Sequence, residues 1–242
     1  QAGNTPNPCV SCNKEIKFGI LLEKALALGA DFIAAGHYAR VSKDTLAFRL
    51  FQARDKEKDQ SYFLWQLRQE QLKRVLFPVG DYTKPEVRKL AKKFKLPVAE
   101  TPESQEICFV QNTTNEFLSR YLKQKPGKIV DINGQVLSRH QGLAFYTIGQ
   151  RKGIGLSGGP YWVLRKDLKK NLLVVIKNEK DLYQKELRFK NVNWLSGKAP
   201  KLPIKVKAKI RYRSKLASAI VSGNKLIFIQ PQRAITPGQS VV

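Results

Sequence analysis

The chain has 242 residues, of which 42% are hydrophobic and 10% aromatic, so a disordered polypeptide is excluded and there is room for two or three small domains. Its longest apolar runs, such as residues 172–176, are far too short to cross a bilayer, and no signal peptide is recognised, which argues against a membrane partner. The 44 Lys and Arg residues outnumber 19 Asp and Glu, and the net charge of +25 predicts a nucleic-acid partner rather than a merely lysine-rich, thermally adapted surface.

Three cysteines, Cys9, Cys12 and Cys108, form an odd set without a secretory signal. This usage predicts a reducing, cytoplasmic setting rather than a structural disulfide framework. The first residue is Gln1 and the chain has no methionine, so we expect the sequence to begin inside a longer protein. It stops at Val242 in a strand-like pattern, and we expect the last module to be truncated as well.

The first hundred residues have the pattern of an α/β unit. Apolar residues at helical spacing predict a helix over 14–28, with Gly29 as its C-terminal cap. The run 30–35 predicts a buried strand, which ends at Gly36-His37-Tyr38. Loops at the carboxyl ends of such strands build ligand sites, so His37 is a candidate site residue; a satisfied core histidine is the alternative.

Further along, helices are predicted over 67–76, 84–96 and 115–122, the second with Thr83 as its N-cap. Beyond about residue 112 short β-like runs dominate. Hairpin turns are expected at Asn133-Gly134 and Gly223-Asn224, and a strand at 204–212. We therefore expect an α/β domain over 1–112, a mostly β central domain over 113–185 and an incomplete β-barrel over 186–242.

Cys9 and Cys12 form a Cys-x-x-Cys, which has three interpretations: half of a zinc site, a redox pair, or one reactive cysteine with a bystander. Zinc needs four ligands, and only Cys108, His37 and His140 remain as candidates, so this reading has thin support. Cys12 precedes the predicted helix, whose partial positive charge, with Lys14 and Lys17, favours a thiolate.

The other polar candidates have ordinary structural alternatives. Cys108 lies between Ile107 and Phe109, as a buried packing cysteine would. His140 has no site-like context and is expected at the surface. Residues 58–61 could be a solvated helix start capped by Asp59 or Ser61.

A series of motifs resembles the tRNA-specific 2-thiouridylase family, in the family's order and over nearly the whole chain. The stretch that resembles the first cysteine motif is Thr5-Pro6-Asn7-Pro8-Cys9-Val10-Ser11-Cys12-Asn13-Lys14-Glu15-Ile16-Lys17-Phe18, and Glu103-Ser104-Gln105-Glu106-Ile107-Cys108-Phe109 resembles the second. The remaining matches are Gly36-His37-Tyr38-Ala39-Arg40, Lys58-Asp59-Gln60-Ser61-Tyr62-Phe63-Leu64, Leu76-Phe77-Pro78-Val79-Gly80, Thr83-Lys84-Pro85-Glu86-Val87-Arg88, Tyr146-Thr147-Ile148-Gly149-Gln150-Arg151-Lys152-Gly153 and Thr236-Pro237-Gly238-Gln239-Ser240.

The resemblance implies a fold and a reaction. The fold would be a PP-loop domain of the adenine nucleotide alpha hydrolase type, followed by the two β-rich modules. The reaction would be ATP-dependent 2-thiolation of the wobble uridine of tRNA (U34), with Mg²⁺ accompanying ATP. A persulfide on Cys108 would deliver sulfur to the adenylated C2 position, Cys12 would be the first catalytic cysteine and act as a nucleophile, and the two would end as a disulfide. A sulfur-relay protein or cysteine desulfurase would supply the sulfur.

The resemblance also assigns binding residues. Gly36 corresponds to a nucleotide-contacting glycine. Asn7, Pro8 and Cys9 correspond to the segment that meets the target base, which must leave its stack to be reached. The positions that correspond to tRNA contacts are His37, Lys58, Asp59, Gln60, Arg211, Tyr212 and Gln239.

Two features depart from the family pattern. Some members carry an acid where this chain has Cys9, so an acid–base role at that position is in doubt. The family's Ser-Gly-Gly-x-Asp-Ser nucleotide loop is not found in these 242 residues; Ser157-Gly158-Gly159-Pro160 lies too late and is expected to be a glycine turn. We therefore expect no independent ATP-dependent thiolation by this chain. The alternatives are a non-catalytic basic RNA-binding module with incidental cysteines and a zinc-dependent structural protein; an iron–sulfur cluster on three cysteines stays open.

Overall fold

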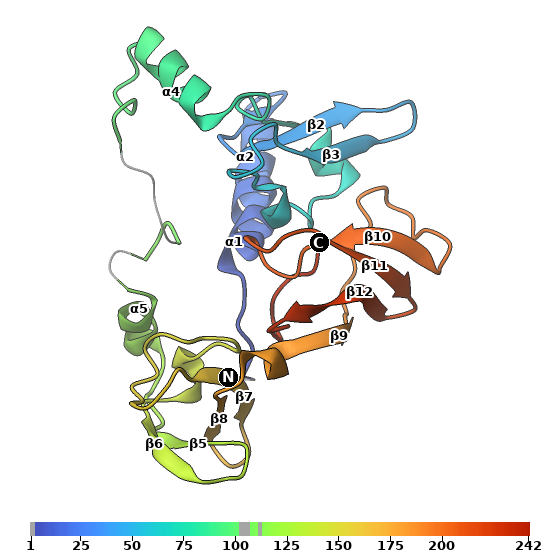
Figure 1. Cartoon of the computed structure of the whole chain (residues 1–242). Helices are drawn as coiled ribbons and strands as arrows, with labels where there is room; N and C mark the ends of the chain where they lie inside the picture. Colours follow the sequence, from blue (N-terminus) through green and yellow to red (C-terminus); the bar gives the residue numbers. More distant parts are fainter. Residues whose placement is uncertain (1–2, 102–106, 111–112) are drawn as a thin grey trace. The chain divides into compact units, whose positions relative to one another are not determined.

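The computed structural model describes residues 3–101, 107–110 and 113–242 (Figure 1). The chain forms two compact units, one of Gln1–Asn7, Cys108–Lys190 and Leu202–Val241, the other of Pro8–Ile107, Asn191–Lys201 and Val242. In the part that the structure describes, no helix is both long enough and apolar enough to span a membrane.

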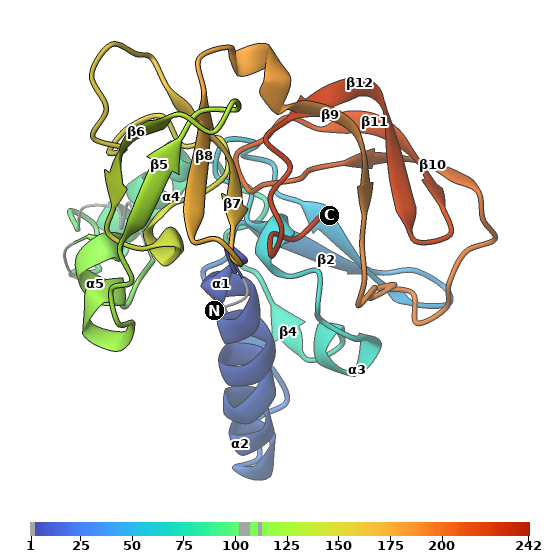
Figure 2. The same cartoon turned by 90° about the horizontal axis from the view of Figure 1, so that it is seen from below.

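The second unit starts with one continuous helical segment, the dark blue rod of Figure 2. It consists of α1 (Pro8–Ser11), the π-helical η1 (Cys12–Ile20) and α2 (Leu21–Ala27). The Leu21 N–H donates to the Ile16 carbonyl, five residues back, which is the π-type bond. At the other end of the rod, Gly29 has φ +89°. The Gly29 N–H donates to the Leu26 carbonyl and the Ala30 N–H donates to the Ala25 carbonyl, which together form a Schellman motif. The predicted helix is confirmed and begins six residues earlier than expected.

The expected buried strand at 30–35 is wrong in length and in burial. Only β1 (Ile33–Ala34) forms, paired in parallel with β4 (Val75–Leu76). Phe32 and Leu76 are 49% and 48% exposed, because a two-residue pair with one neighbour per strand cannot be covered on both faces. Val75 and the partly buried Ile33 still reach the core of this unit, whose buried members are Phe18, Ala39, Leu64, Leu67, Leu72, Val75 and Phe77.

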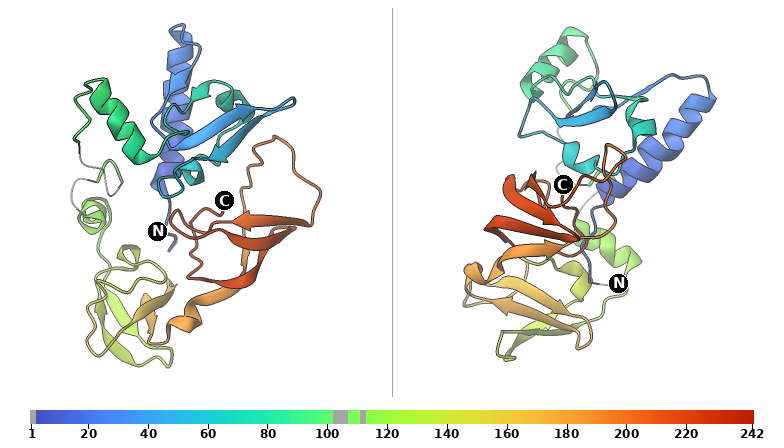
Figure 3. Two further views of the ribbon diagram at one scale, coloured as in Figure 1. Left: turned by 45° about the horizontal axis from the view of Figure 1, so that its top comes forward. Right: turned by 90° about the vertical axis from the view of Figure 1, so that its right-hand side faces the viewer.

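A hairpin and short helices complete this unit. Strands β2 (Ala39–Lys43) and β3 (Phe48–Gln52) pair antiparallel, as the left view of Figure 3 shows. They are followed by η2 (Ser61–Phe63), α3 (Gln69–Leu72) and α4 (Lys84–Lys93). Helix α4 has the predicted Thr83 cap, whose N–H and hydroxyl both donate to Glu86 Oε2 at 2.7 and 2.9 Å. The helix expected at 67–76 is much shorter than predicted.

In the other unit, α5 (Thr114–Tyr121) precedes a four-stranded sheet of order β6-β5-β8-β7. Its strands are β5 (Gly127–Val130), β6 (Val136–His140), β7 (Trp162–Asp167) and β8 (Leu172–Ile176), with η3 (Leu143–Phe145) between β6 and β7. The predicted turn at Asn133-Gly134 joins β5 to β6, with Gly134 at φ +87°. The core includes Ile129, Leu143, Phe145, Val163 and Val175.

His140, expected at the surface, is 2% exposed, so that prediction is wrong. Its Nε2 lies 3.2 Å from the Asn171 carbonyl oxygen, and its ring packs on Tyr146 with centroids 6.0 Å apart. The last residue of β6 turns inward here, which the local sequence, polar on both sides, does not reveal.

Helix η4 (Glu179–Leu182) leads into a second four-stranded sheet, all antiparallel, of order β10-β11-β12-β9 (right view of Figure 3). The strands are β9 (Tyr183–Arg188), β10 (Ile204–Ala208), β11 (Ala217–Ser222) and β12 (Lys225–Arg233), with the predicted turn at Gly223-Asn224 between the last two. β10 ends four residues earlier than expected. Within the described residues both larger sheets stay open. The expected fold class, α/β followed by mostly β modules, is confirmed.

Candidate functional site

The first cysteine motif lies at the start of the helical rod. Cys9 is the second residue of α1 and Cys12 the first of the π segment, and both are half-buried. Cys12 is therefore one turn inside the helix, whereas the sequence placed it just before the helix. The favourable field of a helix N-terminus fades within that turn. Lys14 forms an ion pair with Glu15 at 2.9 Å, which offsets its charge further.

Two buried residues of the same segment fix it to the rest of the unit. Asn13, 3% exposed, donates from Nδ2 to the Phe63 carbonyl at 3.3 Å, and its Oδ1 has no hydrogen-bond partner among the described residues. Phe18 packs its ring against those of His37 and Phe77 at 5.7 and 6.0 Å. The burial of Asn13 does not follow from the sequence, because a polar residue directly before a predicted helix is normally solvated.

His37 lies in this aromatic cluster and is 7% exposed. Burial, and to a lesser extent the charge of Lys17, lowers the pKa of His37 to about 4, so the imidazole is neutral at neutral pH. Among the described residues nothing hydrogen-bonds its Nδ1. Its neighbour Gly36 is exposed, and a Cβ there would meet no atom within 4 Å, so this turn leaves space beside the backbone.

The third predicted motif joins the same place. Gln60 and Tyr38 exchange two bonds: the Gln60 N–H donates to Tyr38 O at 2.7 Å, and the Tyr38 N–H donates to Gln60 Oε1 at 3.0 Å. The structure thus brings together the first cysteine motif, Gly36-His37-Tyr38 and Lys58-Asp59-Gln60, three segments that are separate in sequence.

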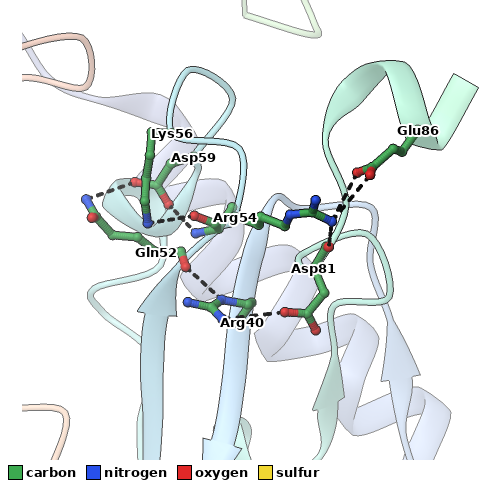
Figure 4. A network of polar contacts seen from close by, with 8 residues as sticks. Arg40, Gln52, Arg54, Lys56, Asp59, Asp81 and Glu86 are labelled. Carbon is green, nitrogen blue, oxygen red and sulfur yellow. Dashed lines mark hydrogen bonds and ion pairs between the residues drawn. The ribbon is translucent and has the colours of Figure 1, made fainter.

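A short helix, η2, begins at Ser61 as considered, but Asp59 is 3% exposed, so the expected solvation of this helix start is wrong for Asp59. Its carboxylate accepts from Ser61 Oγ at 3.0 Å and from the Ser61 N–H at 3.3 Å. It also accepts from the Ala53 N–H at 3.1 Å and from Gln52 Nε2 at 3.4 Å (Figure 4). A buried carboxylate with several donors organises the loop that follows β3.

A more exposed network continues from this loop (Figure 4). Lys56 donates to the Ala53 carbonyl at 2.8 Å, and Arg40 Nε donates to the Gln52 carbonyl at 3.0 Å. Arg54 contacts both Asp81 O and Glu86 Oε1 at 3.3 Å, which connects the loop to the cap of α4. These basic side chains belong to the same unit as His37 and residues 58–60, which are predicted to contact tRNA.

Cys108 belongs to the other unit and is exposed, so a buried packing cysteine is excluded. It lies in a turn whose next residue, Phe109, packs its ring on Phe117 of α5 with centroids 5.4 Å apart. Val110 is buried. The sulfur is therefore open to solvent on a turn that is anchored on its carboxyl side. Glu103-Ser104-Gln105-Glu106 of the second cysteine motif lies outside the described residues.

Of the three candidates nearest the C-terminus, Arg211 and Gln239 bind protein groups of their own unit. Arg211 Nη2 donates to the carbonyls of Ile148 at 2.9 Å and Ala234 at 2.8 Å, and also bonds Thr236 Oγ1. Gln239 Nε2 donates to the Thr5 carbonyl at 2.6 Å. Tyr212, next to Arg211, is half-buried. The resemblance assigned all three to tRNA, and the structure gives the side chains of Arg211 and Gln239 protein partners.

The Cys-x-x-Cys of Cys9 and Cys12 could supply two of the ligands of a metal site. Within 3–101, 107–110 and 113–242, no three or more His, Cys, Asp or Glu side chains gather as metal ligands would. Cys12 and Cys108 are both thiols in the structure, in different compact units.

Three family models match consecutive parts of the chain. They are a tRNA methyl transferase HUP domain over residues 1–112, a tRNA methyl transferase PRC-barrel domain over 115–177 and an aminomethyltransferase beta-barrel domain over 184–242. Together with the α/β unit and the β-rich modules described above, these matches define the class: a multidomain tRNA-modifying enzyme with a nucleotide-binding HUP domain.

The curated relatives specify the family. The chain is 48% identical to the tRNA-specific 2-thiouridylase MnmA of Syntrophomonas wolfei, covering 100% of this chain and 74% of the relative. It is 49% identical to MnmA 2 of a Thermoanaerobacter species and 50% identical to MnmA 1 of Caldanaerobacter subterraneus, each over 99% of this chain and 69% of the relative. The chain belongs to the tRNA-specific 2-thiouridylase family.

Proposed function

We propose that this chain serves the 2-thiolation of tRNA, in which sulfur replaces the C2 oxygen of the wobble uridine. The observation that carries the proposal is the identity of 48–50% to 2-thiouridylases over 99–100% of this chain. The motif resemblance assigns the two catalytic cysteines of the family to Cys12 and Cys108. The family membership supports ATP as the activating co-substrate, with Mg²⁺ as its companion ion. The open space around Gly36 is compatible with the close approach of a nucleotide.

In the proposed reaction, Cys108 carries a persulfide whose terminal sulfur attacks C2 of the uridine, after ATP has converted the C2 oxygen into an AMP leaving group. The Cys12 thiolate then attacks the Cys108 Sγ, the S–S bond of the adduct breaks, and its electrons stay on the sulfur that becomes the thiocarbonyl. A Cys12–Cys108 disulfide results, and a thiol reductant supplies the two electrons that reopen it.

The exposure of Cys108 suits such a carrier, because a sulfur-relay protein or cysteine desulfurase must reach it. We also propose that Asn7, Pro8 and Cys9 meet the target base, and that His37 and residues 58–60 form the wall beside it. His37 is neutral, so it would contact RNA as an uncharged ring and not as a phosphate-binding cation. We retain domain limits at 112 and 185, and a cytoplasmic location, as parts of the proposal; the location rests on the odd cysteine count.

The decisive measurement is the sulfur state of each cysteine by intact mass and peptide mapping, after incubation with a cysteine desulfurase and its substrate. We expect a reductant-labile adduct of one sulfur on Cys108, absent in Cys108→Ser and retained in Cys9→Ser. Three unmodified thiols in the folded chain, together with tRNA binding that ignores Cys12→Ser and Cys108→Ser, would favour a non-catalytic RNA-binding module instead.

A second measurement concerns ATP. These 242 residues do not contain the Ser-Gly-Gly-x-Asp-Ser loop, whose backbone N–H groups would hold the ATP phosphates. We therefore expect no ATP-dependent formation of 2-thiouridine by this chain alone, even where Cys108 accepts sulfur. Thiouridine formation that requires ATP would contradict this part of the proposal.

A further inference from the structure

A turn near the C-terminus holds the residues that lead into the first cysteine motif. The Thr5 N–H donates to the Pro237 carbonyl at 2.9 Å, and Gln239 Nε2 donates to the Thr5 carbonyl at 2.6 Å. Both polar groups of the Thr5 backbone are therefore bound by one turn, 236–239, more than 200 residues away in sequence. All of these residues belong to the same compact unit.

The fit around this contact is close. Gly238 has φ +92°, and a Cβ there would lie 2.8 Å from both Asn4 Cβ and the Thr5 nitrogen. Only glycine combines this backbone conformation with such an approach. On the other side, Lys166 of β7 donates from Nζ to the Gly3 carbonyl at 3.2 Å, and burial lowers the pKa of Lys166.

The turn itself is built to be rigid. The Gln239 N–H donates to the Thr236 carbonyl at 3.2 Å, and the buried Thr236 hydroxyl donates to Ala234 O at 2.9 Å. Arg211 bonds both Ala234 O and Thr236 Oγ1, so its guanidinium fixes the start of the turn. A turn with a fixed backbone limits the positions that are open to the segment bonded to it.

The turn holds Thr5, in the segment that leads into the cysteine helix. Residue 8, where α1 begins, is only three residues beyond Thr5, and four peptide units separate Thr5 from Cys9, an extended reach of about 14 Å. Anchoring Thr5 therefore restricts where the first cysteine motif can go, even when the helix moves. Without that anchor, residues 3–7 would be an ordinary terminal segment, free to fray.

We propose that the turn 236–239 is a clasp for the first cysteine motif and that Gln239 is a positioning residue, acting on Cys9 and Cys12 through Thr5. The consequence for sulfur transfer rests on the proposed function; the clasp itself does not. Gln239 was assigned to tRNA by resemblance, and its donor group is instead used on the Thr5 carbonyl. Any effect of Gln239 on thiolation then comes through the placement of the cysteines.

The test uses the full chain and two substitutions of one side chain. Gln239→Glu keeps the shape but replaces the donor by a carboxylate facing the Thr5 carbonyl, whereas Gln239→Lys restores a donor. Gln230→Glu, at an exposed position of β12, is the matched control for the charge change. Amide hydrogen exchange of residues 3–9, the iodoacetamide rates of Cys12 and Cys108, and the affinity for a tRNA anticodon stem-loop are measured for each.

For Gln239→Glu we expect exchange of the Thr5 amide, which is bonded to the Pro237 carbonyl, to accelerate about tenfold, since a hydrogen bond is worth about 1–1.5 kcal/mol. The Cys12 rate should change relative to that of Cys108, Gln239→Lys should restore the wild-type values, and RNA affinity should match that of Gln230→Glu. An unchanged exchange rate in Gln239→Glu would overturn the clasp, whether or not the affinity for RNA falls. A loss of RNA affinity larger than that of Gln230→Glu would indicate that Gln239 contacts tRNA directly.

If Gln239→Glu does not fold, Gly238→Ala puts a methyl group against Asn4 and Thr5 and is read by the same exchange measurement. We expect the same acceleration, confined to residues 3–9; protection equal to wild type would overturn the proposal. If no persulfide forms on Cys108, the proposed function is contradicted, but the exchange rates of residues 3–9 are unaffected. Failure of the proposed function and failure of the clasp are therefore distinguishable.

Discussion

At the scale of single residues, the side chains that the sequence singles out in the α/β unit are mostly bound to the protein itself. Asp59 receives donors from Gln52, Ala53 and Ser61, and Gln60 accepts from Tyr38. Such residues can shape an RNA-binding wall without touching RNA directly. Substitutions there should therefore be judged first by stability, since a buried donor left without its acceptor costs about 1–3 kcal/mol.

His37 gives the sharpest residue-level prediction. Its pKa falls from the ordinary 6.5 to about 4 in the folded chain, because burial disfavours the imidazolium. Between those values the unfolded chain binds a proton that the folded chain does not, so stability rises with pH. The contribution is complete above pH 6.5 and is lost as the pH falls toward 4. The difference between the two pKa values corresponds to about 3 kcal/mol in the free energy of unfolding, at about 1.4 kcal/mol per pKa unit.

The measurement is urea unfolding of wild type and His37→Leu at pH 7 and pH 4, because leucine is close in volume and suits the ring cluster of Phe18 and Phe77. The wild type should lose about 3 kcal/mol more than the variant between the two pH values. Burial also lowers the pKa of His140, and both proteins keep that effect, so it cancels in the comparison. Equal losses would show that His37 is protonated in the folded chain near pH 6.

At the scale of elements, the π segment is the unusual feature of the site, because it carries Cys12 at its first residue and Gly19 near its end. The wider turn brings the Lys14 carbonyl oxygen to 2.8 Å from where a Cβ of Gly19 would lie. In an ordinary exposed helix, glycine to alanine is stabilising by about 1 kcal/mol. At Gly19 the added methyl group would meet the Lys14 carbonyl oxygen, so the change to alanine should destabilise the fold rather than stabilise it.

We therefore expect Gly19→Ala to lower the free energy of unfolding by about 1 kcal/mol or more, and to alter the alkylation rate of Cys12. Ala27→Gly, in the α-helical part of the same rod, is the control and should cost about 1 kcal/mol from propensity alone, without affecting Cys12. A more stable Gly19→Ala would mean that the segment relaxes to an α-helix and that the π geometry is incidental.

The comparison of sequence and structure differs from element to element. Local signals succeeded: the Gly29 and Thr83 caps and the turns at Asn133-Gly134 and Gly223-Asn224 follow from backbone requirements of a few residues. Predictions that depended on neighbouring elements failed. The run 30–35, for example, would be buried only if other strands flanked it, which the local sequence does not determine. The π register is likewise invisible to helical periodicity, and the clasp on Thr5 joins residues too distant for any local pattern.

The candidate site divides in the same way. Motif resemblance selected the cysteines, the Gly36 turn and the Asp59 loop, and the structure brings the cysteine helix, Tyr38 and Gln60 together in one unit. What residue identity could not give is the state of each group: His37 buried and neutral, Asp59 bound by donors, Cys108 exposed. Burial is a property of the packed neighbours and not of the local sequence.

At the scale of the whole molecule, charge is the dominant property. If every one of the 19 acidic side chains paired with a cation, 25 of the 44 Lys and Arg would still lack an acidic counterpart. Such an excess opposes the compact state by self-repulsion, and a polyanion relieves it. A charge of this size is thus better explained by a function in RNA binding than by stability.

The resulting prediction concerns salt. Affinity for tRNA should fall steeply with ionic strength, because each phosphate neutralised releases a counterion; six such contacts would weaken binding about a thousandfold between 50 and 200 mM salt. Fluorescence anisotropy with a labelled anticodon stem-loop measures the slope, and Cys12→Ser and Cys108→Ser should leave it unchanged, because neither substitution removes a Lys or Arg side chain. A shallow slope, of one or two contacts, would mean that the lysines are merely a solvated surface. In that case recognition would depend on the uncharged wall around His37 and Gln60, and substitutions there, not salt, would control affinity.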